Sequence, residues 1–241
     1  MDTRRLNTVS LALIAGSFAF SAVLFLWLPD QIPSHWTLAG EVDDTMSRAW
    51  GAFMMPLVML GLYGVFRAIP ALSPKGYGID AANSGFVGIR IAALALFALL
   101  NVLILISALG VPIAMDSAIS ISVGGLLTVL GWFLDRLPRN FFVGIRTPWT
   151  IVDADNWTRT HRLGKWLFIA AGLAMIVGGI MAAKLKMPDR IVGTCLFVCA
   201  VIALLIGAEL VTAALVPGLF FMIGCGLGIA APSRDMMIRA A

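Results

Sequence analysis

Long uncharged apolar stretches dominate the hydrophobic pattern of the chain. They cover residues 6–29, 49–66, 91–115, 117–134, 166–183 and 191–208, and residues 210–233 are again uncharged. A helix that crosses a bilayer needs about 20 predominantly apolar residues. The first six stretches therefore predict six spans of an all-α fold, a polytopic transmembrane helical bundle.

The apolar region from Ile191 to Ala231 is too long for a single span. We expect it to fold back near Glu209 or at Pro217–Gly218, which makes 210–233 a seventh apolar segment. A re-entrant or interfacial segment is the alternative. At the other end, Arg4 and Arg5 precede an apolar run that is too long for a signal peptide, so we interpret it as a retained first helix.

Composition narrows the class of protein. The chain is 60% hydrophobic and 12% charged, about half the charge usual in soluble domains, so a soluble globule is excluded. A net charge of +4 is too small to indicate a nucleic-acid partner. The three cysteines lie in apolar runs without a CxxC motif or a nearby histidine. They are better explained as buried apolar side chains than as metal ligands, and we expect no cofactor.

The distribution of lysine and arginine predicts the orientation in the membrane, because cytoplasmic loops carry an excess of both. With the N-terminus inside, the inner segments hold Arg4, Arg5, Arg67, Lys75, Arg90, Arg136, Arg139, Arg146, Arg159, Arg162 and Lys165. The outer segments hold only Arg48, Lys184, Lys186 and Arg190. Arg234 and Arg239 fit this rule if the C-terminus is also inside, which argues against a full seventh span.

Two regions follow from this pattern. Residues 1–134 form an N-terminal region of four helices with an outer loop at 29–49. Residues 135–241 hold a cytoplasmic loop, 135–165, and the C-terminal helices. The segment 71–84 is a shorter polar linker.

The outer loop reads PDQIPSHWTLAGEVDDTMSR. Pro29 and Pro33 predict a rigid, extended exit from the first helix. Trp36 suits the membrane interface. The later carboxylates Glu41, Asp43 and Asp44 allow three interpretations: a solvated acidic loop, a cation site that includes His35, or a surface that meets an extracellular ligand. Their spacing lacks the ligand density of a calcium loop.

The inner loop, PRNFFVGIRTPWTIVDADNWTRTHRLGK, is the densest polar and aromatic stretch of the chain. Thr150 followed by Asp153 fits a capping box, so we start a helix there and continue it into the next span. On that helix Trp157, His161, Gly164 and Phe168 share one face. This face is either a docking surface or an interfacial anchor.

Enzymatic chemistry finds little support in the sequence. The chain has two histidines, His35 and His161, which the predicted topology puts on opposite sides of the membrane. They cannot form one catalytic pair or share one metal. Transport of a small solute is the alternative function, and Asn101 and Glu209 are the strongly polar residues that would serve it.

Both loops carry a family resemblance. The segment PRNFFVGIRTPWT, followed by WTRTHRLGK, resembles the signature of the SdpI bacterial immunity-protein family. The outer segment LPDQIP, with the following His-Trp, Gly and Arg, resembles the domain of unknown function that often forms the N-terminal part of that family. Two departures are Arg48, where lysine is more usual, and the apolar extension after about Leu215.

This resemblance implies a non-catalytic membrane protein that protects its cell from a secreted peptide toxin, relays a signal across the bacterial cytoplasmic membrane, or does both. The implied partners are the bilayer, a peptide toxin outside and a cytoplasmic regulator inside, without nucleic acid. The candidate docking residues are Pro33, His35, Trp36, Gly40, Asn140, Gly144, Arg146, Thr147, Pro148, Trp149, Trp157, Thr160 and His161.

Overall fold

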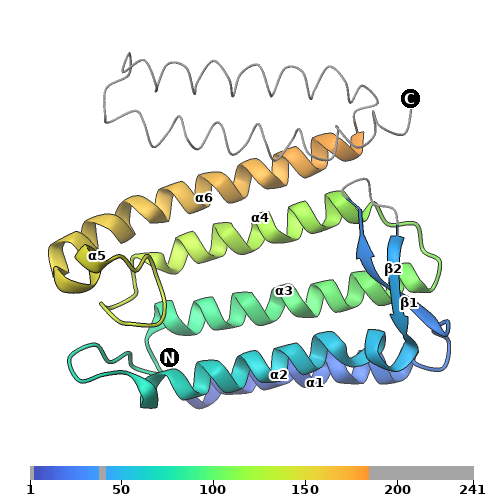
Figure 1. Ribbon diagram of the computed structural model, residues 1–241, viewed down its shortest axis with the longest axis horizontal. Coiled ribbons are helices and arrows are strands. Elements are labelled where there is room, and N and C mark those ends of the chain that lie inside the picture. Colours follow the sequence, from blue (N-terminus) through green and yellow to red (C-terminus); the bar gives the residue numbers. More distant parts are fainter. Residues whose placement is uncertain (1–2, 38–41, 185–241) are drawn as a thin grey trace.

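The structure is a computed structural model that describes residues 3–37 and 42–184. Helices dominate it, and the first helix is followed by a two-stranded antiparallel sheet (Figure 1). In chain order the elements are α1 (Thr3–Leu24), β1 (Gln31–Trp36), β2 (Val42–Ser47), α2 (Arg48–Leu72), α3 (Ser84–Ala108), α4 (Met115–Leu134), α5 (Pro148–Val152) and α6 (Ala154–Lys184).

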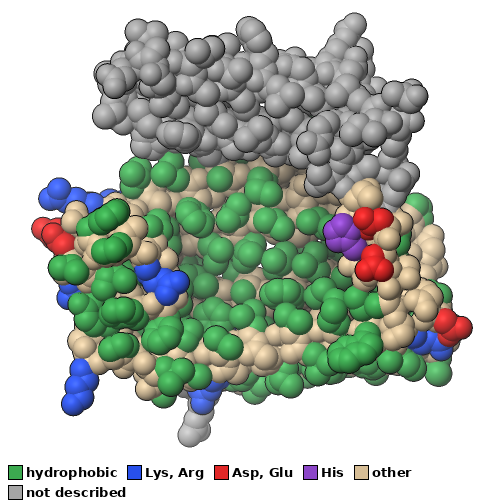
Figure 2. Space-filling view, viewed as in Figure 1, with side chains coloured by type: hydrophobic (Ala, Val, Ile, Leu, Met, Phe, Trp, Pro, Cys, Tyr) green, Lys and Arg blue, Asp and Glu red, His purple; other side chains and the backbone are tan. Residues whose placement is uncertain are grey.

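Five of the described helices, α1, α2, α3, α4 and α6, are long and apolar enough to cross a membrane. The predicted all-α polytopic bundle is confirmed, and these helices correspond to the first five apolar stretches. The sixth stretch and the seventh segment, 191–208 and 210–233, lie outside the described residues. Figure 2 shows apolar side chains over the flank of the bundle and charged side chains mainly at its two ends. Such a surface suits a hydrocarbon environment.

Helix α3 begins earlier than the uncharged stretch predicts. It starts at Ser84 because Asn83 caps it, with the Asn83 side chain accepting a hydrogen bond from the Phe86 N–H. Arg90 therefore lies inside the helix, where it is 2% exposed and its guanidinium lies 5.6 Å from the Tyr63 ring centre. The sequence prediction was wrong here because a charge-free criterion excludes a buried cation.

The helices lie side by side, with α1 and α2 at one edge and α3, α4 and α6 following in order (Figure 1). Glycines bring α4 and α6 together: a Cβ added at Gly124 would lie 2.6 Å from the Gly172 carbonyl oxygen, and one added at Gly131 would lie 2.7 Å from the Lys165 carbonyl oxygen. Small residues permit this backbone approach between membrane helices. Gly124 thus serves packing inside one chain, and α4 continues unbroken through it.

The outer segment is a β-hairpin, which the sequence analysis took for a loop. Gln31 pairs with Ser47 and Pro33 with Thr45, and the register shifts beyond Pro33. Ile32 is the buried residue of β1, and it packs against α2 where Gly51 leaves room: a Cβ at Gly51 would lie 2.6 Å from the Ile32 Cβ. The hairpin is thereby fixed to the end of the bundle.

Buried apolar side chains gather at both ends of the bundle. At the hairpin end the cluster consists of Leu28, Ile32, Ala52, Ile104, Leu105 and Met115. At the α5 end it consists of Phe66, Ile69, Ile79, Phe86, Ile89, Leu134, Leu137 and Trp157. These two clusters hold the segments in which the candidate functional residues lie.

Candidate functional site

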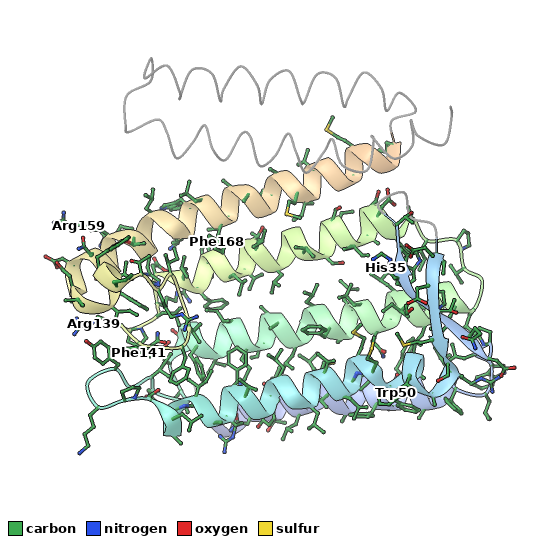
Figure 3. All side chains as sticks on the ribbon, viewed as in Figure 1. His35, Trp50, Arg139, Phe141, Arg159 and Phe168 are labelled. Carbon is green, nitrogen blue, oxygen red and sulfur yellow. The ribbon has the colours of Figure 1, made fainter. Side chains whose placement is uncertain are left out.

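The residues singled out in the sequence lie at opposite ends of the bundle. Figure 3 shows His35 at the hairpin end, and Arg139, Phe141 and Arg159 at the α5 end. We call residues 135–153, which connect α4 to α6 and include α5, the cap. The hairpin, residues 31–47, and the cap are therefore two separate candidate sites.

Asn140 builds the first turn of the cap. Its side-chain Nδ2 donates to the carbonyl oxygens of Pro138 and Val143, both at 2.9 Å. Its Oδ1 accepts from the N–H groups of Phe142 at 2.8 Å and Val143 at 2.7 Å. Asparagine favours such local side-chain to backbone bonds. The residue is 0% exposed, so its amide serves the turn rather than a partner.

Gly144 brings the backbone of the cap onto α6. Its φ is +120°, in the region that favours glycine. A Cβ there would lie 2.4 Å from the His161 Nε2 and 3.2 Å from the Trp157 Cη2. Only a residue without a side chain fits this contact.

His161 joins α6 to the cap through both ring nitrogens. Its Nδ1 lies 2.8 Å from the Trp157 carbonyl oxygen, and its Nε2 accepts the Ile145 N–H at 3.1 Å. Because a carbonyl can only accept, the proton is on Nδ1 and the ring is neutral in this arrangement. The imidazole also stacks on the Trp157 ring, with 3.9 Å between ring centres.

Trp157 completes this contact. Its indole Nε1 donates to the Leu137 carbonyl oxygen at 3.0 Å, and the side chain is 3% exposed. His161 is 1% exposed. The helix face expected from the sequence exists, but Trp157 and His161 point into the cap, not outward. Gly164, on the same face, packs against Ile145 and Leu134.

The helix that leads into this face begins differently from the prediction. The capping box joins Thr147 to Thr150, because the Thr150 N–H donates to the Thr147 Oγ1 at 3.3 Å and the Thr147 N–H donates to the Thr150 Oγ1 at 2.8 Å. Thr147 is extended, the conformation that a residue before proline prefers. Helix α5 then ends at Val152, so the predicted box between Thr150 and Asp153 was wrong.

Asp153 instead starts α6. Its Oδ1 accepts the N–H groups of Asp155 at 2.7 Å and Asn156 at 3.1 Å. A carboxylate accepting from the first turn satisfies free backbone donors and stabilises the helix start. From Ala154 the helix continues through His161 into the membrane span, as expected.

Other predicted residues lie on the outside of the cap. Trp149 is 65% exposed. Arg146 is exposed, although one guanidinium nitrogen donates to the Phe141 carbonyl oxygen at 2.6 Å. Pro148 is exposed as well, whereas Thr147 and Thr160 are half-buried.

The linker 73–83 also contributes to this end, which the sequence analysis did not anticipate. The Tyr77 ring meets the Phe141 ring edge-on at 5.0 Å, and the Arg139 guanidinium lies 5.1 Å from the Tyr77 ring centre. The Asn83 Nδ2 donates to the Arg136 carbonyl oxygen at 3.2 Å. An aromatic residue in a polar linker was the one sequence signal for this contact.

At the other end, the hairpin exposes a polar pair. The His35 Nδ1 lies 2.6 Å from the Asp43 Oδ1, and their side chains are 67% and 45% exposed. Pro33 and Trp36 are half-buried, and Trp36 packs on the apolar cluster at this end. Gly40 lies outside the described residues. Within the described ranges, no group of three His, Cys, Asp or Glu side chains could hold a metal ion.

Arg48 fixes the base of the hairpin. Its Nε donates to the Pro29 carbonyl oxygen at 3.3 Å, and a terminal nitrogen donates to the Asp30 Oδ1 at 2.5 Å. Arginine can make both contacts because its donors are spread over a planar fork, which lysine lacks. This geometry explains how Arg48 serves a position where lysine was expected.

The fold and these two ends define a polytopic helical membrane protein with a folded segment at each end of its bundle. Residues 136–232 match the model of the SdpI/YfhL protein family, and residues 12–60 match a domain of unknown function, DUF1648. The suspected family resemblance is thereby confirmed, and it includes both the hairpin and most of the cap.

One curated relative is the Immunity protein SdpI of Bacillus subtilis (strain 168). The two sequences are 27% identical over 174 residues, which is 71% of this chain and 80% of that protein. No solved structure matches the chain.

Proposed function

We propose that this chain is an integral membrane immunity protein of a bacterial cytoplasmic membrane. It gives resistance to a secreted peptide toxin, relays a signal across the membrane, or does both, without catalysis. The observation that carries the proposal is the likeness to a protein named for immunity, over 71% of this chain.

In this proposal the N-terminus and the cap are cytoplasmic, and the hairpin is outside. The basic residues support this orientation, because Arg136, Arg139, Arg146, Arg159 and Arg162 all belong to the cap or the start of α6. The hairpin end carries the exposed His35–Asp43 pair instead. A peptide that arrives from outside would meet the hairpin first.

For the cytoplasmic regulator we propose the outer surface of the cap. Arg146 and Trp149 are the exposed members of the predicted docking set on this surface. Exposed tryptophan and arginine are typical of residues that contribute strongly to binding. Asn140, Trp157 and His161 support this surface from below through their contacts within the cap.

The separation of the two histidines supports a non-catalytic role. The two histidines lie at opposite ends of helices of 20 residues or more, and a helix of this length spans about 30 Å. Transport of a solute gains no support, because the Asn101 Nδ2 joins α3 to α1 by donating to the Ser21 Oγ at 3.1 Å. Glu209 lies outside the described residues.

The test is protection from the toxin in living cells. A Bacillus subtilis strain without its own SdpI, but expressing this chain, should survive exposure to the peptide toxin better than cells with an empty vector. Asp43→Ala, which removes the partner of His35, should weaken protection. The matched control is Asp44→Ala, since the Asp44 Oδ1 accepts the N–H of its own neighbour Thr45 at 2.8 Å.

Membrane levels of each variant are measured by immunoblotting, so that loss of protein is separated from loss of function. Survival equal to the empty vector, at a membrane level equal to that of SdpI in its own strain, contradicts the proposal. If Asp43→Ala and Asp44→Ala protect equally well, the His35–Asp43 pair has no part in the proposed function.

A further inference from the structure

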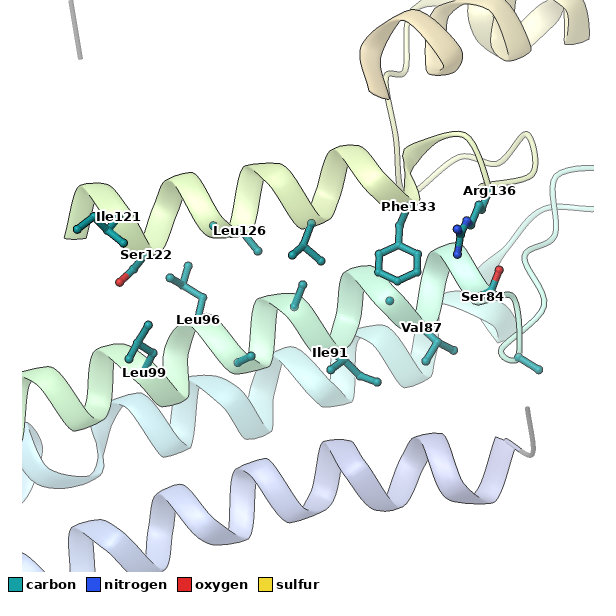
Figure 4. A pocket seen from close by; sticks show the side chains of 16 residues that line it. Ser84, Val87, Ile91, Leu96, Leu99, Ile121, Ser122, Leu126, Phe133 and Arg136 are labelled. Atoms are coloured by element: carbon teal, nitrogen blue, oxygen red, sulfur yellow. The ribbon is translucent and has the colours of Figure 1, made fainter. Parts of the chain in front are cut away.

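A groove of about 730 Å³ runs between α3 and α4. Its volume lies in the range of ligand sites in proteins. Figure 4 shows Leu99 and Ile121 at one end and Ser84 and Arg136 at the other. The groove therefore follows the helices from the middle of the membrane to the end that carries the cap.

Small and apolar side chains form its walls. On α3, Gly88, Ala92 and Ala95 follow one another at helical spacing, and Gly125 lies opposite on α4. A Cβ added at Gly125 would meet nothing within 4 Å, so the groove is open at that point. The walls of the groove suit a hydrocarbon chain, because apart from Ser84, Ser122 and Arg136 the side chains that line it are apolar.

The dimensions decide what can lie there. The lining runs along α3 from Ser84 to Leu99, which is about 22 Å at the rise of an α-helix. An extended acyl chain can follow an apolar groove of this length between the two helices. The groove is longer than the hydrocarbon thickness of one leaflet, about 15 Å, so it has room for the full depth of an acyl chain from the leaflet on the cap side.

Arg136 supplies a charge at the mouth. Its guanidinium lies over the rings of Trp132 and Phe133, 5.6 and 5.2 Å from their centres. The ion pairs within the described ranges join His35 to Asp43, Arg48 to Asp30 and Lys165 to Asp135, so no described carboxylate pairs with Arg136. A phosphate at the level of the lipid headgroups would complement this charge.

We propose that the groove binds one anionic phospholipid of the leaflet on the cap side, with an acyl chain between α3 and α4 and its phosphate at Arg136. Helices α3 and α4 are in tight contact where the Phe133 ring covers Gly88. The lipid would fill the space between the two helices beside this contact. This site is independent of the proposed toxin and regulator surfaces, because neither the hairpin nor Arg146 and Trp149 line it.

The test is native mass spectrometry of the full chain, purified in mild detergent and incubated with phosphatidylglycerol or phosphatidylcholine. Wild type should retain one phosphatidylglycerol and hold it more tightly than phosphatidylcholine. Gly125→Leu, which fills the groove, should lose most of this retention, and Ala95→Leu on the facing helix should do the same. Arg136→Gln should weaken phosphatidylglycerol about fivefold, the effect of one charge near an anionic surface, and should weaken phosphatidylcholine less, because the choline cation already offsets its phosphate.

Matched controls separate the site from general effects. Gly61→Leu adds the same side chain at an exposed position of α2 with open space around it, and should retain lipid as wild type does. Arg159→Gln removes an exposed charge on α6 and should also have no effect. Retention unchanged by both Gly125→Leu and Ala95→Leu overturns the proposal. So does a dimer without bound lipid that Gly125→Leu dissociates, because the groove would then hold a second copy.

Discussion

Replacing Gly144 by alanine is expected to disrupt the cap and to lower the free energy of unfolding by about 3 kcal/mol or more. Two costs combine. An alanine at φ +120° is strained, and its Cβ would lie 2.4 Å from the buried His161 Nε2. His161 cannot move away without losing its bonds to Ile145 and Trp157. The measurement is the thermal midpoint of the detergent-solubilised chain.

Two other glycines separate these costs. Gly76 has φ +83° with open space around it, so Gly76→Ala should show the backbone strain alone, about 1 kcal/mol. Gly78 has open space and no positive φ, so Gly78→Ala should leave the midpoint unchanged. A Gly144→Ala protein as stable as wild type would contradict the contact between the cap and α6.

Replacing His161 by alanine is expected to cost about 2–4 kcal/mol, because it leaves a buried N–H of Ile145 without its acceptor and opens a cavity beside Trp157. The loss of function in this variant should follow the loss of folded protein. Measuring the thermal midpoint and toxin protection on the same variants tests this.

Trp149→Ala provides the contrast. Its side chain is 65% exposed, so the midpoint should stay near that of wild type while any docking role is lost. Arg162→Ala, at an exposed position next to His161, is the control for a change on α6. A stable His161→Ala protein that has lost function would mean that His161 meets a partner directly, as the sequence alone suggested.

The apolar pattern predicted the described spans well, because each helix is long and apolar enough to cross a bilayer. It failed at Arg90, where burial against α2 allows a cation inside a helix. It also failed at the hairpin. Residues 31–36 and 42–47 show no alternation of apolar and polar positions, and their order depends on Ile32 fitting over Gly51, a contact between distant parts of the chain.

The sequence singled out the face of α6 that carries Trp157 and His161, but it did not show that this face is covered. Helical spacing correctly put Trp157 and His161 on one face, yet spacing alone does not say what covers that face. The cover is the backbone at Gly144 and Ile145, which reaches α6 because Asn140 forms the preceding turn. Arg146 and Trp149, from the same signature, are exposed, and the proposed function assigns them to a partner.

The most direct test of the account is the sidedness of the hairpin and the cap. In a chain whose Cys195, Cys199 and Cys225 are replaced by serine, single cysteines are placed at two exposed valines, Val42 in the hairpin and Val152 in the cap. A membrane-impermeant maleimide should label Val42→Cys in intact cells, and Val152→Cys only after the membrane is permeabilised. Labelling of both positions from outside, or of Val152→Cys alone, would contradict a bundle with an outer hairpin and a cytoplasmic cap.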